Sequence, residues 1–207
     1  MAETADRLSC GAGIAAPVVT LGAIFVATLL SPEFGWSGNA LSDLGSTLSA
    51  ASTPATRLVF NGGLIGGGLV GLGFGYALVR AARNRVELLG VGLFGLDLVA
   101  LVLIGVFPLG TEPHVPVAIA FYGLLSAALW TYGSGNVMAG DRTHGIATVL
   151  AGVVNSGAWA VWIATGDLLR PGLALPEIVG AVLFAGWAVG TSLDVLDRLG
   201  PGREFET

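Results

Sequence analysis

The sequence contains no lysine, one cysteine and few charged residues. All nine basic residues are arginines, and charged residues make up 11% of the chain, against about 25% in a typical soluble domain. The lack of lysine excludes a retinal protein, because a Schiff base needs a lysine amine. The single Cys10 excludes an internal disulfide. No run of basic residues is typical of a nucleic-acid footprint, so we expect no nucleic-acid partner.

Hydrophobic residues, in contrast, make up 54% of the 207 residues. Apolar runs long enough to cross about 30 Å of hydrocarbon recur along the chain. Such runs must be helical, because lipid offers the backbone no hydrogen-bond partners. We therefore predict an all-α polytopic helical bundle, a single integral membrane domain over residues 1–207, surrounded by the lipid bilayer of the cell membrane. The six predicted spans are 9–31, 57–80, 88–108, 116–139, 145–165 and 176–196.

The arginines predict the orientation of these spans. An even number of spans places both termini on one side of the membrane, and cytoplasmic loops are enriched in basic residues. The side of the termini holds Arg7, Arg80, Arg83, Arg85, Arg142, Arg198 and Arg203, whereas the opposite side holds Arg57 and Arg170. We predict that both termini are cytoplasmic and that the loop after the first span faces outward.

This first outer loop contains "NALSDLG", residues 39–45. Leu41, Leu44 and Leu48 recur at helical spacing. They predict a short helix in the outer interface, with Asn39 as its cap and Asp43 near the positive end of the helix dipole. A second interpretation is that the stretch forms one wall of an outward-facing polar pocket. The sequence leaves both interpretations open.

Span two carries a ridge of small residues, with glycine at every fourth position. Gly63, Gly67, Gly71 and Gly75 form this glycine ridge. Such ridges allow helices to approach closely in lipid. The ridge indicates internal packing or, alternatively, the contact face of a homo-oligomer.

Asp97 lies about nine residues into span three, at a depth of roughly 13 Å. A carboxylate at that depth is costly, so we expect it to face the bundle interior and to have a partner. Asn155 lies at a similar depth in span five and could donate a hydrogen bond to Asp97. Trp159 follows Asn155 by one turn on the same face. These residues predict a proton, ion or substrate site, or a polar link between helices.

Near the outer ends of the spans lie further polar residues. His114 follows span three, where a loop histidine is more often solvated than liganded, and Asn61 lies about one turn into span two. Together with Glu112, Asn39 and Asp43 they form a candidate outer polar cluster, and Ser42 is a further candidate for ligand binding. Their spacing matches no metal-binding motif, so we predict no metal and no cofactor.

Three short signatures occur in order, namely "NALSDLG", "FNGGLIGGG" and "GVFPLGTEPHVP". With them the chain resembles the multi-pass membrane family called domain of unknown function 998, which is common in archaea and bacteria. The resemblance covers about residues 10–197. It implies a six-helix integral membrane protein and no particular activity. The acidic, lysine-free composition is typical of a high-GC genome such as that of a halophile, and we expect an archaeal source.

The sequence supports three hypotheses of function. The first is an outward-facing polar pocket, with its floor toward Asp97 and Asn155, that binds a small polar ligand, a lipid headgroup or an ion. The second is a membrane enzyme that acts on lipid or isoprenoid through Asp43 and His114. The third is a non-catalytic partner subunit that packs through the glycine ridge.

Overall fold

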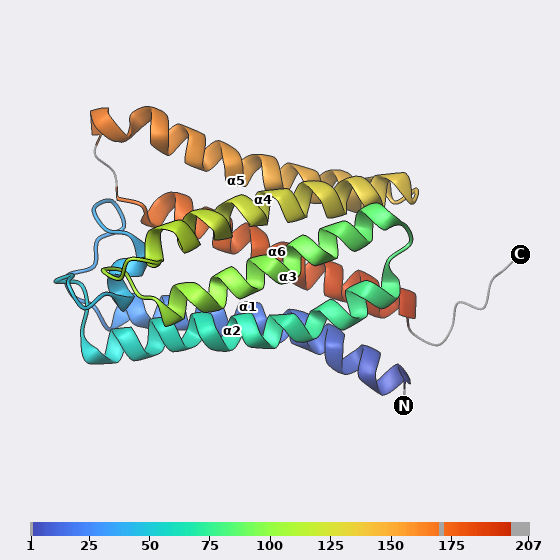
Figure 1. Ribbon diagram of the computed structural model, residues 1–207, viewed down its shortest axis with the longest axis horizontal. Helices are drawn as coiled ribbons and strands as arrows, with labels where there is room; N and C mark the ends of the chain where they lie inside the picture. The colour runs from blue at the N-terminus through green and yellow to red at the C-terminus, as the bar shows by residue number, and fades with distance from the viewer. Residues whose placement is uncertain (1, 170–171, 200–207) are drawn as a thin grey trace, which may run out of the picture.

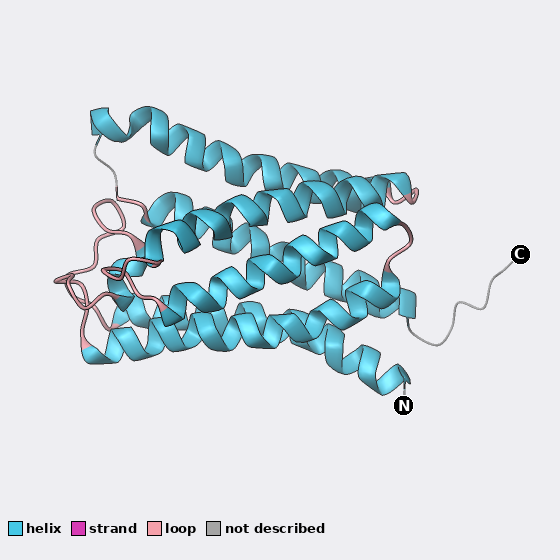
Figure 2. Cartoon of the chain, viewed as in Figure 1, coloured by secondary structure: helices cyan, strands magenta, loops and turns pink. Residues whose placement is uncertain are grey.

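The computed structural model describes residues 2–169 and 172–199, so Arg170 and Arg203 lie outside the described residues. Within the described ranges the chain forms six α-helices and one short 3-10 helix (Figure 1). Figure 2 shows that loops join these helices, with no strand among the described residues. The elements are α1 (Ala2–Leu29), η1 (Leu41–Gly45), α2 (Pro54–Ala81), α3 (Arg85–Val106), α4 (His114–Met138), α5 (Arg142–Leu169) and α6 (Ala174–Leu199).

The predicted six spans are confirmed, although every helix begins earlier than the apolar run that predicted it. Local capping accounts for two of these starts. Thr53 and Thr56 form a reciprocal capping box at the start of α2, where Pro54 fits the first helical turn. Asn84 accepts hydrogen bonds from the backbone nitrogens of Val86 and Glu87 at the start of α3. Caps are polar, so hydropathy alone does not detect them.

The helices run up and down in one bundle, and the most extensive contacts join consecutive helices from α1 to α5. The last helix, α6, packs against α1 and α5. In Figure 1 the start of α1 and the end of α6 lie at the same end of the bundle, which we call the terminal end. The opposite end holds η1 and the connection between α3 and α4, and we call it the η1 end. That the terminal end faces the cytoplasm stays a prediction.

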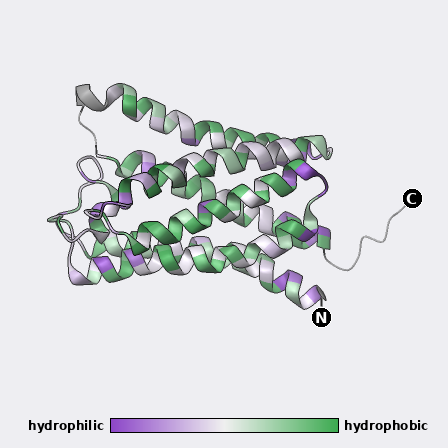
Figure 3. Cartoon of the chain, in the orientation of Figure 1, coloured by the Kyte–Doolittle hydropathy of each residue, from purple (hydrophilic) through white to green (hydrophobic). Residues whose placement is uncertain are grey.

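The helix surfaces are those of a membrane protein. Each of the six helices found in the described ranges is long and apolar enough to cross a bilayer. Figure 3 shows hydrophobic residues along the helices, and hydrophilic residues gathered mostly toward the ends of the bundle. Large apolar side chains such as Leu69, Ile119 and Ile163 are exposed, as expected for side chains that meet lipid. Which membrane contains the protein stays a prediction.

The glycine ridge of α2 packs inside the chain. A β-carbon at Gly63 would collide with Ala23, and one at Gly67 would collide with Thr20, both on α1. A β-carbon at Gly75, by contrast, would meet nothing within 4 Å. Gly63 and Gly67 of the ridge therefore serve the contact between α1 and α2, and the contact face of a homo-oligomer stays a prediction.

The first loop contains a shorter helix than the sequence predicts. η1 spans five residues and buries Leu41 and Leu44, but Leu48 is 79% exposed. The predicted stripe is wrong at Leu48, because the chain turns extended at Ser46, whose hydroxyl donates to the Leu109 carbonyl (2.9 Å). Backbone bonds from residues 172 and 174 to residues 37 and 39 tie the same loop to the start of α6.

Candidate functional site

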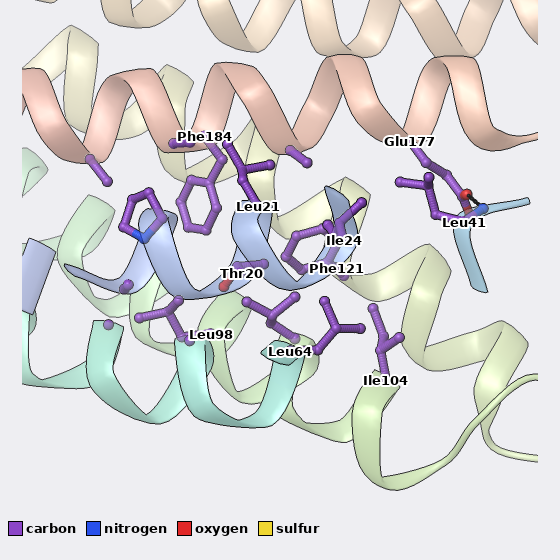
Figure 4. A pocket seen from close by; sticks show the side chains of 18 of the residues that line it. Thr20, Leu21, Ile24, Leu41, Leu64, Leu98, Ile104, Phe121, Glu177 and Phe184 are labelled. Carbon is purple, nitrogen blue, oxygen red and sulfur yellow. Dashed lines mark hydrogen bonds between the residues drawn. The ribbon is translucent and has the colours of Figure 1, made fainter. Parts of the chain in front are cut away.

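A cavity of about 80 Å³ lies between α1, α2, α3, α4 and α6. A buried water needs about 10–15 Å³ of such space, so the cavity admits several groups of that size. Its walls are mostly apolar, and Figure 4 shows side chains from different helices turned toward one another around it. They include Leu21, Ile24, Leu64, Leu98, Phe121 and Phe184.

The polar side chains that line the cavity belong mainly to its η1 end. Ser42 comes from η1, His114 from the first turn of α4, and Glu177 from the first turn of α6. All three are buried. Tyr122 lies about two turns farther along α4 and also lines the cavity. The site is therefore an apolar cavity with one polar end, formed by Ser42, His114 and Glu177, and we use the word mouth for this polar end.

Glu177 joins the loop to the mouth. Its Oε2 atom accepts a hydrogen bond from the backbone nitrogen of Leu41 (2.5 Å), as the dashed line in Figure 4 shows. Leu41 is the first residue of η1, and the first amide groups of a helix have no partner within it. Glu177 also lies near the positive end of the α6 dipole. Glu177 is not among the residues predicted from the sequence, because an acidic residue in the first turn of a helix is ordinary. Its position beside an apolar span was the available signal.

His114 is buried rather than solvated, with 4% of its surface exposed. The expectation of a solvated loop histidine is wrong, because α4 begins at His114 itself. Its Nδ1 atom lies 2.8 Å from the carbonyl oxygen of Phe107. A carbonyl only accepts, so Nδ1 carries a proton, and in the neutral ring Nε2 is then an acceptor.

Asn39 and Asp43 build the loop and do not line the cavity. The Oδ2 atom of Asp43 accepts from Asn39 Nδ2 (3.0 Å) and from the backbone nitrogen of Ala40 (2.9 Å). Asn39 Oδ1 accepts from the backbone nitrogen of Gly35 (2.9 Å). The predicted cap is wrong in detail. Ala40 occupies the cap position, and the side chain of Asp43 serves its amide group.

Asn61 also holds backbone. Its Nδ2 atom donates to the carbonyl of Gly45 (3.1 Å) at the end of η1. A β-carbon at Gly45 would collide with Asn61 and Phe60, so glycine allows the close approach of η1 to α2. Of the predicted outer cluster, His114 reaches the cavity, as does the further candidate Ser42. Asn39, Asp43 and Asn61 hold the loop, and Glu112 is exposed and does not line the cavity.

The deeper predicted residues lie away from the cavity. Asp97 is completely buried, and neither carboxylate oxygen has a hydrogen-bond partner among the described residues. Asn155 donates to the Tyr122 carbonyl (3.2 Å) and to Ser126 Oγ (2.8 Å). The predicted bond from Asn155 to Asp97 is therefore wrong, because Asn155 on α5 faces α4. Trp159 packs its ring against Tyr122, with centroids 4.6 Å apart.

The described residues form no cluster of metal-binding side chains. Within residues 2–169 and 172–199, no group of three or more His, Cys, Asp or Glu side chains is placed to hold a metal ion. The polar mouth supplies one carboxyl, one imidazole and one hydroxyl group. These groups can accept hydrogen bonds from a ligand at the end of an apolar space.

The fold defines a six-helix integral membrane protein with an internal cavity. The chain belongs to the family described as "Protein of unknown function (DUF998)", whose model matches residues 14–194. The resemblance drawn from the three signatures is thereby confirmed. No curated protein and no solved structure matches the chain.

Proposed function

We propose that the protein binds a single-chain amphiphile, with the polar head at the mouth and the hydrocarbon chain inside the cavity. The observation that carries this proposal is the division of the cavity surface. Polar side chains gather at the η1 end, and the walls beyond it are mostly apolar. Such walls accept a hydrocarbon chain from the surrounding lipid without exposing it to water, and a few placed polar groups fix its orientation.

This proposal narrows the ligand classes that the sequence predicts. A small polar ligand would need polar partners on several sides, but most of the wall is aliphatic or aromatic. An ion would need several oxygen or nitrogen ligands close together. Among the classes predicted, a lipid with its headgroup at the mouth agrees best with the lining.

The two rival hypotheses receive less support. An enzyme that uses Asp43 and His114 would need both in one site, but Asp43 is bound to Asn39 and the Ala40 amide group. A partner subunit that packs through the glycine ridge would need an accessible ridge, but Gly63, Gly67 and Gly71 are buried.

Native mass spectrometry of protein extracted with its lipids tests the proposal. We expect a defined extra mass of a single-chain amphiphile on the folded protein. Ala185→Leu adds volume to the cavity wall, where the ligand chain would lie. Crowding of this kind in a packed interior costs about 1–3 kcal/mol, and we expect a similar loss in the free energy of binding. The bound fraction should then fall by about tenfold.

Ala160→Leu is the matched control, because Ala160 is exposed on α5. The same enlargement there should leave the bound mass unchanged. A protein without any bound amphiphile would contradict the proposal, and so would one that loses the mass equally in both variants.

A further inference from the structure

We infer that the head group bound at the mouth is a hydrogen-bond donor, an alcohol or an amine, and not a phosphate or a carboxylate. This inference rests on the proposed function and names the chemical class of its ligand. It follows from the hydrogen-bonding capacity of the mouth and from the charges that surround it.

The mouth mainly offers acceptors. Glu177 is only 7% exposed, and one carboxyl oxygen serves the Leu41 amide group. A carboxylate has about four acceptor positions, so one bond leaves capacity for a ligand. His114 adds a second acceptor, since its Nδ1 proton points to the Phe107 carbonyl and Nε2 of the neutral ring is left to accept.

Among the described residues, the cavity lining contains no arginine or lysine side chain to receive an anion. The chain has no lysine, and no arginine is among the described residues that line the cavity. Arg57, at the η1 end, directs Nη1 to the hydroxyl of Ser52 (3.4 Å). A phosphate or carboxylate head would thus meet Glu177 with no arginine among the described lining residues to pair with it, and burying unpaired charge is costly.

The hydroxyl groups of the lining complete the match. Thr20, Ser42 and Tyr122 each carry a hydroxyl group, which can donate one hydrogen bond and can also accept. An alcohol head can donate to Glu177 or His114 and accept from Ser42. An amine can donate to both acceptors and, when charged, can pair with Glu177.

The tail then runs along α6 toward the terminal end of the bundle. From Glu177 to Ala188, both of which line the cavity, the helix rises about 16 Å. Trp187 lies beside this path without lining it. Its ring is stacked on Phe184 at 6.0 Å and lies 5.3 Å from Phe94, two residues of the cavity wall. Trp187 is therefore a natural reporter of a chain that enters the cavity.

The test uses four probes with one tail and different heads. The protein is first freed of its bound lipids and then reconstituted in nanodiscs. It is titrated with bromoundecanol, bromoundecylamine, bromoundecanoic acid and bromoundecyl phosphate. The pH is kept well above the pKa of the acid probe. Bromine quenches tryptophan fluorescence at short range, so quenching that disappears in Trp187→Phe reports occupation of the cavity.

We expect the alcohol and the amine to quench Trp187 at concentrations at least about tenfold lower than the acid and the phosphate. In Glu177→Gln the side chain keeps a carbonyl oxygen for Leu41 and gains a donor. The preference over the acid probe should then shrink by about tenfold. Glu112→Gln, a change of the same charge on an exposed residue at the same end, should leave the preference intact.

Two other outcomes separate the possible failures. Equal quenching by all four probes would overturn the inference about the head and leave tail binding in place. Absence of Trp187-dependent quenching by every probe would overturn the proposed function itself. Both decisions use the wild-type protein, so they do not depend on the folding of Glu177→Gln.

Discussion

Glu177 accepts a hydrogen bond from the backbone nitrogen of Leu41, a residue 136 positions earlier in the chain. The bond joins the first turn of α6 to the first residue of η1, so one buried carboxyl group both holds the loop and lines the cavity. The architecture of the mouth therefore depends on a contact between two segments that lie far apart in the sequence.

Removal of that contact should destabilise the protein. Glu177→Ala leaves the Leu41 amide group buried without a partner, which costs about 1–3 kcal/mol. Glu177→Gln keeps an acceptor and should lose much less. Thermal unfolding in a mild detergent measures the difference, and equal melting temperatures for the two variants would contradict the structural role.

Asp97 should tolerate loss of its charge. No described group donates to its oxygens, and a carboxylate at membrane depth costs a few kcal/mol on insertion scales. We expect Asp97→Asn to match or exceed the wild type in thermal stability. Asn155→Ala, which loses two hydrogen bonds, should cost about 1–3 kcal/mol. A larger loss for Asp97→Asn than for Asn155→Ala would reveal a partner of Asp97.

The glycine ridge offers a pair of substitutions with opposite signs. Gly63→Ala collides with Ala23 of α1 and should destabilise by about 1–3 kcal/mol. Gly75→Ala has open space around it and should stabilise by about 0.5–1 kcal/mol through helix propensity. Parallel melting curves measure both. A stabilising Gly63→Ala would show that α1 does not rest on this ridge.

An ion pair between Arg83 and the buried Glu87 lies at the terminal end. Glu87 is fully buried and accepts from Arg83 Nε (3.0 Å) and Nη2 (2.7 Å), while Arg83 Nη2 also donates to Asn136 (2.5 Å). Burial lowers the pKa of Arg83. The hydrogen bond to Glu87 and the nearby carboxylates raise this pKa by more than burial lowers it, so the pKa lies above its usual value.

Glu87→Ala should cost about 1–3 kcal/mol, because it leaves buried donors unpaired. Arg83 keeps 29% side-chain exposure, so water softens the loss relative to a fully buried pair. Thermal unfolding is again the measurement. The exposed pair of Arg7 with Glu3 provides the control, and Glu3→Ala should change little.

The cytoplasmic position of the terminal end is open to a direct test. Thr47 at the η1 end and Thr143 at the terminal end are both exposed threonines, whereas Cys10 is buried. In intact cells a membrane-impermeant thiol reagent should label Thr47→Cys and spare Thr143→Cys. The reverse labelling pattern would invert the predicted orientation.

The sequence alone determined the class of protein and its helix count. Hydropathy is a local property, and a long apolar run in lipid has to satisfy its backbone within one helix. The family signatures, and Ser42 and His114 within them, could also be found in the sequence. Short polar stretches stand out from the long apolar runs on either side of them.

Only the tertiary structure decided which side chains meet. These helices are apolar on most faces, and lipid is as apolar as a helix interface, so periodicity does not report rotation about the helix axis. That rotation turns Asn155 toward Ser126 instead of Asp97 and packs Gly67 against α1. The packing of α6 beside η1 brings Glu177 to Leu41. The partner of a buried polar group depends on this packing and not on distance along the sequence.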